Sequence, residues 1–359
     1  MRITSSMIFS QLARALQKNM EDFSTLNSQL ASGKRIQKPS DDVIGMVKSL
    51  DYRLSINTTE QYKKNIEEGN FQLQFASDVL GSVSNSLLEL KELISLGGNA
   101  QSQENRSFYA QQAAKWRDFL LDLSNTKLRE RYIFSGYQTN QEAFTYNSNT
   151  YQYDYNGDLG EINVLIDREA TLPLNIPGSN AFSFTMNGQL PTELPDGTPI
   201  TYTQATDPLT GITATTVEIG NAGDPEYDTF TFSNLMDMAN VLSFAFEYKD
   251  IDGSDLNADP DMQEEIALHR IAALSLPLDG GQNQVLNVQA EIGTRQVRLN
   301  DQQTRLDSSA LNLTNALSET EDADMDKTIT EILKTQTALD ALREAASRII
   351  SESLIDFLK

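Results

Sequence analysis

Proline is confined almost entirely to the middle of the chain. Nine of the ten prolines lie between Pro173 and Pro277, and the tenth, Pro39, stands near the start. A proline inside a helix removes a backbone hydrogen bond and clashes with the preceding turn, so long helices form where proline is scarce. The sequence therefore predicts long helices in both flanks and shorter elements between them.

The flanks carry the apolar periodicity of coiled-coil helices. Apolar residues recur between Tyr62 and Ile94 in alternating steps of four and three, and this helix is expected to end at Gly97-Gly98. A second helix is predicted around Trp116, and residues 285–313 hold an apolar column at seven-residue spacing. One helix cannot bury such a stripe alone. We therefore expect the C-terminal helix to return and pack on the N-terminal pair as a bundle.

The middle of the chain has the composition of short antiparallel strands. Pro195-Asp196-Gly197 is a turn signal within residues 144–231. Further helical spacing predicts helices at Leu235–Phe246 and around Ile266–Leu276. The predicted strands are Tyr151 to Tyr155, Ile162 to Ile166, Phe182-Ser183-Phe184 and Phe230-Thr231-Phe232.

Both ends of the chain are amphipathic helices. The N-terminal one is expected to stop at Ser32-Gly33. One interpretation is that the two helices only extend the bundle; the other is that their apolar stripes form contacts between subunits and become ordered on assembly. The stripe residues, which we take as candidate subunit-interface positions, are Ile8, Leu12, Leu16, Met20, Phe23, Leu26 and Leu30 at the N-terminus and Leu339, Leu342, Ile349, Leu354 and Phe357 at the C-terminus.

Composition excludes several classes of function. Cysteine is absent and His269 is the one histidine, which removes thiol nucleophiles, zinc fingers and nearly every histidine-based catalytic design. Residues 140–270 hold 22 acidic residues against three basic ones, a local charge of -19, so nucleic acid is not an expected partner. No apolar run is long enough to span a membrane, and the start lacks the apolar core of a cleavable signal.

An acidic segment, residues 250–261, leaves calcium binding open, because its aspartates supply oxygen ligands at alternate positions. The spacing does not fit an EF-hand, however, since Gly253 is misplaced and no glutamate closes the loop. A solvated acidic loop is the preferred interpretation. We expect no cofactor, no metal and no enzymatic activity.

The residues after the first helix resemble a known family. Leu26-Asn27-Ser28-Gln29-Leu30-Ala31-Ser32-Gly33-Lys34-Arg35-Ile36-Gln37-Lys38-Pro39-Ser40-Asp41-Asp42 is similar to the N-terminal signature of flagellar hook-filament junction proteins of the FlgL type, hook-associated proteins of the flagellin-like family. Residues 131–136, 291–299 and 318–326 and the ending 354–358 also match. Val43 and Gly45 depart from the family, which often has proline and alanine there. Read locally, Ser40 is expected to cap a helix whose first turn holds Asp41 and Asp42.

The resemblance implies a fold that is mainly α: an elongated, flagellin-like bundle of long coiled-coil helices from both chain ends with an inserted β-rich outer domain. We expect terminal helices at residues 1–40 and 320–359 as an assembly domain, a helical bundle with a β-hairpin at 41–170 and 232–319, and a variable outer domain at 171–231. The positions of this chain that match the family's N-terminal motif are Ser32, Gly33, Lys34, Arg35, Ile36, Pro39, Ser40, Asp41 and Asp42.

The family also implies a function. The chain would be an extracellular structural subunit at the hook-filament junction of the bacterial flagellum. It would contact neighbouring copies of itself, a second hook-associated protein on the hook side and flagellin on the filament side. Export would use the flagellar type III apparatus without a cleavable signal, with a cytosolic chaperone beforehand. The filament flagellin itself and an intracellular coiled-coil adaptor stay open as alternatives.

Overall fold

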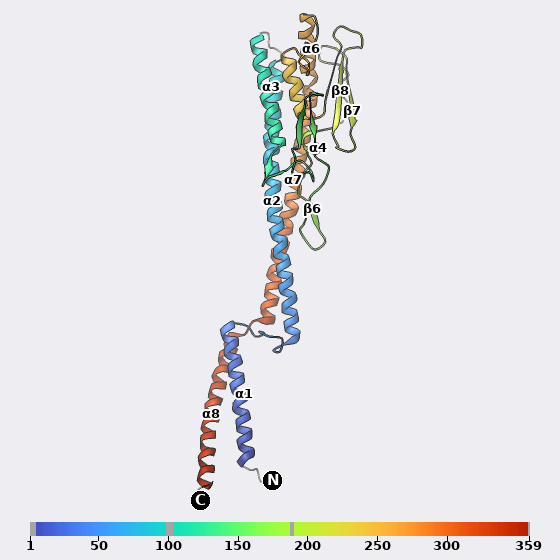
Figure 1. Cartoon of the computed structure of the whole chain (residues 1–359). Helices are drawn as coiled ribbons and strands as arrows, with labels where there is room; N and C mark the ends of the chain where they lie inside the picture. Colours follow the sequence, from blue (N-terminus) through green and yellow to red (C-terminus); the bar gives the residue numbers. More distant parts are fainter. Residues whose placement is uncertain (1–4, 98–102, 187–189, 358–359) are drawn as a thin grey trace. The chain divides into compact units, whose positions relative to one another are not determined.

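The computed structural model describes residues 5–97, 103–186 and 190–357, and these form two compact units (Figure 1). Unit 1 comprises Met1–Gln61 and Thr304–Lys359, and unit 2 comprises Tyr62–Gln303. The long helices α2 (Val43–Gly97) and α7 (Ser275–Glu321) contribute residues to both units. The division into three domains that the sequence suggests is not tested by this division into two units and remains a prediction.

Unit 1 is built from helices. α1 (Ser5–Ser32) and α8 (Met325–Phe357) lie side by side, as Figure 1 shows in dark blue and red. α1 ends where predicted, because Gly33 adopts φ +71°, a left-handed conformation that closes a helix and that glycine accepts without a steric penalty. The Gly33 amide donates to the Gln29 carbonyl at 2.8 Å, which satisfies one of the open carbonyls of the last turn.

The predicted helical seams of unit 2 are confirmed. The seam positions of α2 from Ile66 to Leu90 are buried, and so are Val285, Ile292 and Leu299 of the apolar column on α7. α3 (Gln103–Ser124) packs against α5 (Leu235–Phe246), whose apolar side chains are buried except for the partly exposed Phe244. Burial of these stripes is the main source of stability for helices of this kind.

Two boundaries differ from the sequence prediction. The helix expected around Ile266–Leu276 is α6 (Pro260–Ala273), and α7 begins directly after it at Ser275. Pro277 therefore lies in the first turn of α7, where its missing amide hydrogen costs nothing because first-turn amides have no helical partner.

Among the described residues of unit 2, the β structure consists of three two-stranded hairpins and one three-stranded sheet with the order β7-β8-β9, all antiparallel. The sheet contacts α5 through β9 and α6 through β8. The strands are β1 (Lys127–Leu128), β2 (Arg131–Tyr132), β3 (Phe144–Asn147), β4 (Gln152–Tyr155), β5 (Asn163–Leu165), β6 (Thr171–Pro173), β7 (Ile200–Thr206), β8 (Thr213–Ile219) and β9 (Asp228–Phe232).

Two strand predictions were wrong at particular residues. Phe182-Ser183-Phe184 is not a strand: α4 (Gly178–Phe182) ends there, and Phe182 packs edge-on against Phe134 with ring centroids 5.1 Å apart. The apolar–polar alternation arises because Ser183, which follows α4, has an extended backbone, so that Phe182 and Phe184 on either side of it are both buried in the core. Tyr151 lies in the turn before β4 with φ +58° rather than in the strand.

A buried polar network fastens the β3–β4 hairpin to α5. Asp237 is buried and accepts hydrogen bonds from the amides of Tyr153 and Ser233 at 2.8 and 2.9 Å. Asn234 caps α5 by accepting from the Asp237 amide, and its side chain donates to the Tyr153 carbonyl. Burial raises the pKa of Asp237 to about 7, against the opposing effect of these amide donors.

Candidate functional site

The two terminal stripes partly cover each other within one chain. On α1, the described stripe residues Leu12, Leu16, Phe23, Leu26 and Leu30 are partly buried and Met20 is exposed. On α8, Leu339 is buried and Leu342 is partly buried. The side chains of Ile8, Ile349, Leu354 and Phe357 lie outside the described residues. The stripes are thus brought together by the α1–α8 contact, while their role between subunits is untested.

The seam between α1 and α8 is incompletely filled. A shallow cleft lies along it, lined mainly by polar side chains, with Leu26 as its apolar member. The other lining residues are Asp22, Thr25, Gln29, Glu331, Lys334 and Thr335. A seam of this polarity holds two helices together weakly, because little apolar area is removed from water.

The family motif folds into a compact junction between the helices of unit 1, which we call the clasp (residues 33–42 with 320–324). Lys34 and Asp322 form an antiparallel bridge, and the Ala323 amide donates to the Gly33 carbonyl at 2.9 Å. The Arg35 amide donates to the Glu321 carbonyl at 2.7 Å, and the Arg35 guanidinium to the Thr320 carbonyl at 2.8 Å. Backbone pairing of this kind ties the segment that follows α1 to the end of α7.

Glu321 is the charged centre of the clasp. Its side chain is only 5% exposed and pairs with Lys34, at 2.6 Å, and with Arg53, whose Nε donates at 3.2 Å. The hydrogen bond from Arg53 is the largest cause that holds the pKa of Glu321 below its usual value, with a further contribution from Lys34. The carboxylate therefore stays ionised and organises two basic side chains around one point.

The sequence prediction for the start of α2 was wrong by two residues. Asp42, and not Ser40, caps the helix, because its Oδ1 accepts from the Gly45 amide at 2.9 Å and α2 begins at Val43. Asp41 accepts from the amides of Gln37 and Lys38 instead, which closes a turn over Pro39 before the helix starts. The Gly45 hydrogen bond lowers the pKa of Asp42.

Gly45, a departure from the family pattern, has a packing reason. Ile36 of the clasp is buried directly against it, and a Cβ at position 45 would meet Ile36 Cδ1 at 2.5 Å. The absence of a side chain at residue 45 therefore lets Ile36 close the clasp over the first turn of α2.

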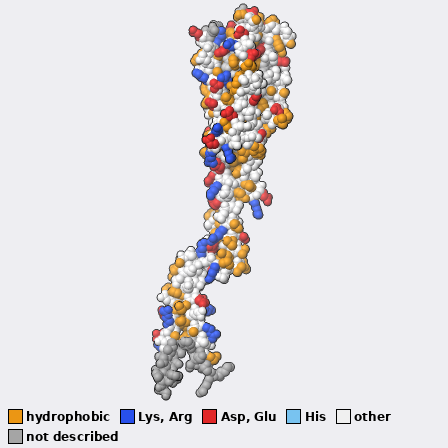
Figure 2. Space-filling view, viewed as in Figure 1, with side chains coloured by type: hydrophobic (Ala, Val, Ile, Leu, Met, Phe, Trp, Pro, Cys, Tyr) orange, Lys and Arg blue, Asp and Glu red, His pale blue; other side chains and the backbone are white. Residues whose placement is uncertain are grey.

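Sequence reasoning missed an exposed apolar surface on α2. Val43, Val47, Leu50 and Leu54, spaced four, three and four residues apart, are between 51% and 66% exposed, and Ile44 beside them is exposed too. We call the four residues the α2 stripe. Figure 2 shows hydrophobic side chains gathered over this end of α2. An exposed patch of large aliphatic residues marks an interaction surface.

The sequence does contain a signal for the α2 stripe, because polar and aliphatic residues exchange faces between the first turns of α2 and the rest of the helix. In its first turns the buried positions are small or polar, including Gly45, Ser49 and Thr59, whereas the large aliphatic residues face outward. On α8, Met325, Ile329 and Leu333 form a second exposed row, at four-residue spacing. Comparing the phase of the aliphatic residues with the phase of the downstream seam would have identified the α2 stripe.

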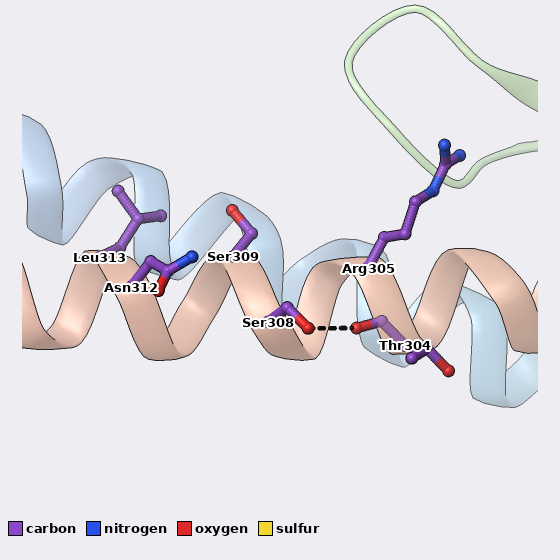
Figure 3. Close-up of a pocket in the computed structure, with 6 residues that line it drawn as sticks. All are labelled: Thr304, Arg305, Ser308, Ser309, Asn312 and Leu313. Carbon is purple, nitrogen blue, oxygen red and sulfur yellow. Dashed lines mark hydrogen bonds between the residues drawn. The ribbon is translucent and has the colours of Figure 1, made fainter.

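A depression on α7 offers no catalytic arrangement. Its six lining residues, Thr304, Arg305, Ser308, Ser309, Asn312 and Leu313, all come from one helix (Figure 3). The Ser308 hydroxyl donates to the Thr304 carbonyl at 3.1 Å, and none of the six is a carboxylate or imidazole that could act as a general base.

The other candidate polar sites have structural partners. His269 contacts Asp196 at 2.8 Å, which fixes α6 to the turn predicted at residues 195–197. In the acidic segment, Asp250 pairs with Arg270 at 2.9 Å and Asp252 accepts from Ser254. Over the part of the chain that the structure describes, no three His, Cys, Asp or Glu side chains are grouped to hold a metal ion. No described helix is long and apolar enough to cross a membrane.

Comparison with known proteins gives matches to both flanks. Residues 3–139 match the bacterial flagellin N-terminal helical region, and residues 277–358 match the bacterial flagellin C-terminal helical region. Flagellar hook-associated protein 3 of Escherichia coli is 24% identical over 362 residues, which covers 100% of each chain. Flagellin of Listeria monocytogenes is 30% identical, but over 112 residues, 30% of this chain and 38% of the relative.

The fold also matches solved structures. The crystal structure of flagellar hook-associated protein 3 from Legionella pneumophila superposes with a TM-score of 0.55 at 17% sequence identity, covering 75% of this chain and 97% of that one. At this identity the likeness shows a shared fold. It agrees with the helical flanks and β-containing middle described above.

Proposed function

Because this chain belongs to the bacterial flagellin family, among the relatives of flagellar hook-associated protein 3, we propose that it is the structural subunit that joins the flagellar hook to the flagellin filament. The observation that carries the proposal is the match to hook-associated protein 3 along the whole length of both chains, against a flagellin match limited to 112 residues. The family consists of structural proteins of the flagellum, and we assign no enzymatic reaction to the chain.

The assembly surface is proposed to lie in unit 1. The terminal stripes, from Leu12 to Leu30 on α1 and at Leu339 and Leu342 on α8, supply a weakly held helix pair. The α2 stripe and the exposed row on α8 supply aliphatic surface that neighbouring copies can cover. Residues 1–40 with 320–359 are the proposed assembly domain, and residues 171–231 the proposed outer domain.

The size of these surfaces favours assembly on a template. The four α2 stripe side chains are already partly covered, so full burial would contribute about 1–2 kcal/mol each, on the order of 4–8 kcal/mol together. Loss of translational and rotational freedom on association costs roughly 4–15 kcal/mol. One such contact does not hold two copies together, whereas several contacts made at once on an existing hook tip do.

The proposed partners follow from the junction role. One face of the subunit layer would contact a second hook-associated protein, the other would contact flagellin, and copies of this chain would contact each other. Before assembly, a cytosolic chaperone would hold the C-terminal region, and export through the flagellar type III apparatus would place the chain outside the cell. The exposed aliphatic rows of unit 1 give a physical reason for a chaperone, since they favour premature association.

The test is a clean deletion of the gene in the native host, with electron microscopy of the flagella and an assay for flagellin in the medium. Bare hooks with flagellin released into the medium are the expected result, because filament subunits would be exported without a surface on which to assemble. Bare hooks without released flagellin would identify the chain as the filament subunit. Normal flagella would reject any structural role there.

A further inference from the structure

Unit 2 contains a cavity that the junction role does not explain. It lies under the β1–β2 hairpin, has a volume of about 440 Å³, and falls in the size range of about 300–1,000 Å³ that ligand pockets occupy. Ala76, Leu174 and Ile176 form an apolar floor, and Arg129 and Arg131 lie at the rim. The cavity therefore suits an apolar group that carries a negative charge beside it.

The hairpin at the rim is held in a costly conformation. Arg129 and Glu130 form its two-residue connection with φ values of +49° and +65°, which glycine and asparagine adopt far more readily. Arg129 is fixed there by an ion pair with Glu68 at 2.6 Å and lies over the ring of Phe71. Arg131 is exposed, and no hydrogen bond or ion pair to its side chain occurs among the described residues.

The same unit presents an apolar knob with a fixed negative charge. Leu209, at the tip of the β7–β8 hairpin, is 83% exposed, the highest exposure of any large hydrophobic side chain in the described residues. Asp207 accepts from the Leu209 amide at 2.9 Å and from the Thr210 hydroxyl at 2.8 Å, and the first of these bonds lowers its pKa. The turn is thus preorganised, and docking it would require little further ordering.

We propose that the cavity under the β1–β2 hairpin receives Leu209 of a neighbouring copy, with Asp207 of that copy beside Arg131. The occupant is a second copy of this chain because knob and cavity are complementary in polarity and charge and belong to the same sequence. A knob and a cavity at different places on one surface make a head-to-tail contact, which closes into a ring or continues as a helix. The inference rests on the proposed function, since it supplies a lateral contact between subunits of one layer.

The chain contains no cysteine, so single engineered cysteines give an unambiguous test. Leu209→Cys and Ile162→Cys, the latter at the cavity mouth, are expressed together in the native host, so that a disulfide between them joins two copies. Flagella are purified, oxidised and separated without reductant. We expect a dimer of twice the 40.0 kDa chain mass in the Leu209→Cys with Ile162→Cys pair.

The matched control replaces Leu209→Cys by Ala222→Cys, an exposed position at the other end of the same sheet. Addition of Arg131→Glu to the Ile162→Cys chain should lower the dimer yield to less than about a tenth, because the charge beside Asp207 is reversed. This side chain has no partner to lose within the described residues, so the fold is retained.

The outcomes separate this inference from the proposed function. Monomer in the purified flagella with no dimer, or a dimer equally abundant with Ala222→Cys, overturns the knob-and-cavity contact and leaves the junction role standing. A cross-linked product of another mass shows a different occupant and also overturns it. Absence of the chain from the flagella, detected by antibody, counts against the proposed function itself.

Discussion

Arg270 should be the most sensitive single residue in unit 2. Its side chain is 2% exposed and pairs with Asp228, which is 10% exposed, through two guanidinium nitrogens, and with Asp250, which is 39% exposed, at 2.9 Å. The ring of Phe230 lies 5.4 Å from the guanidinium carbon. These contacts fasten α6 to β9 and to the acidic segment.

Replacing Arg270 by methionine leaves Asp228 buried without its cation. Removing one partner of a buried ion pair costs about 3–5 kcal/mol, whereas Asp250 is exposed enough to be rehydrated at little cost. Adding Asp228→Leu to Arg270→Met removes the buried charge, so the double variant should be more stable than the sum of the two single changes implies, by about 2–3 kcal/mol. The exposed pair Lys91–Asp279 gives a control: Lys91→Met should cost less than about 1 kcal/mol.

The chain offers a built-in probe for this measurement. Its single tryptophan, Trp116, lies on α3, which packs against α5 in unit 2, so urea unfolding of the full chain followed by tryptophan fluorescence reports on this unit. The result that refutes the reasoning is additivity. The reasoning fails if Arg270→Met lowers the free energy of unfolding no more than Lys91→Met does. It also fails if the double variant loses the full sum of the two single losses, because the ion pairs of Arg270 with Asp228 and Asp250 would then not hold unit 2 together.

Three further predictions concern the surface and the pH dependence. Leu50→Asp on the α2 stripe should lower the unfolding free energy by no more than about 1–2 kcal/mol, because half of the side chain is already exposed, yet it should prevent incorporation into flagella. Ser55→Asp, at an exposed position five residues on, should be incorporated; equal incorporation of the two variants would reject the α2 stripe as a contact surface. Glu321→Gln should destabilise unit 1 by about 1–2 kcal/mol, discounted because Lys34 and Arg53 are 43% and 46% exposed. Because the pKa of Glu321 is lowered in the folded chain, its ionised carboxylate stabilises the fold above the ordinary pKa of 4.5, and this stabilisation is lost as the pH falls below it. Urea melts at falling pH should show the loss in the wild type and not in the Glu321→Gln variant. The pKa of Asp237 is raised, so unit 2 should instead lose stability as pH rises from about 4 to about 8, and Asp237→Asn should flatten that dependence in fluorescence-detected melts.

The helical flanks were predictable because their periodicity is redundant. From Ile66 to Leu90 each apolar step repeats the same phase, so an error at one residue does not change the result. The junction at residues 33–42 was predictable as a motif, but its capping residue was not. Asp41 and Asp42 are both good caps, and only the hydrogen bonds to Gln37 and Lys38 decide which one caps α2.

Tertiary contacts decided the remaining elements. Phe182-Ser183-Phe184 has strand composition, yet its aromatic rings fill a core shared with Phe134, so packing overrides the local propensity. The ion pair of Arg270 with Asp228 and the hydrogen bond between His269 and Asp196 join segments far apart in sequence, and no local pattern predicts them. The α2 stripe was not predicted because its aliphatic residues recur at the same spacing as the downstream seam and differ from it only in the face of the helix on which they lie.

The most direct test of the central claim is the position of this chain along the flagellum. Isolated hook-filament complexes from the native host are labelled with gold-conjugated antibody against residues of the proposed outer domain and viewed by electron microscopy. The junction role predicts label confined to a short zone where hook and filament meet. Label along the whole filament would show that the chain is the filament subunit, and absence of label from the complexes would contradict the account.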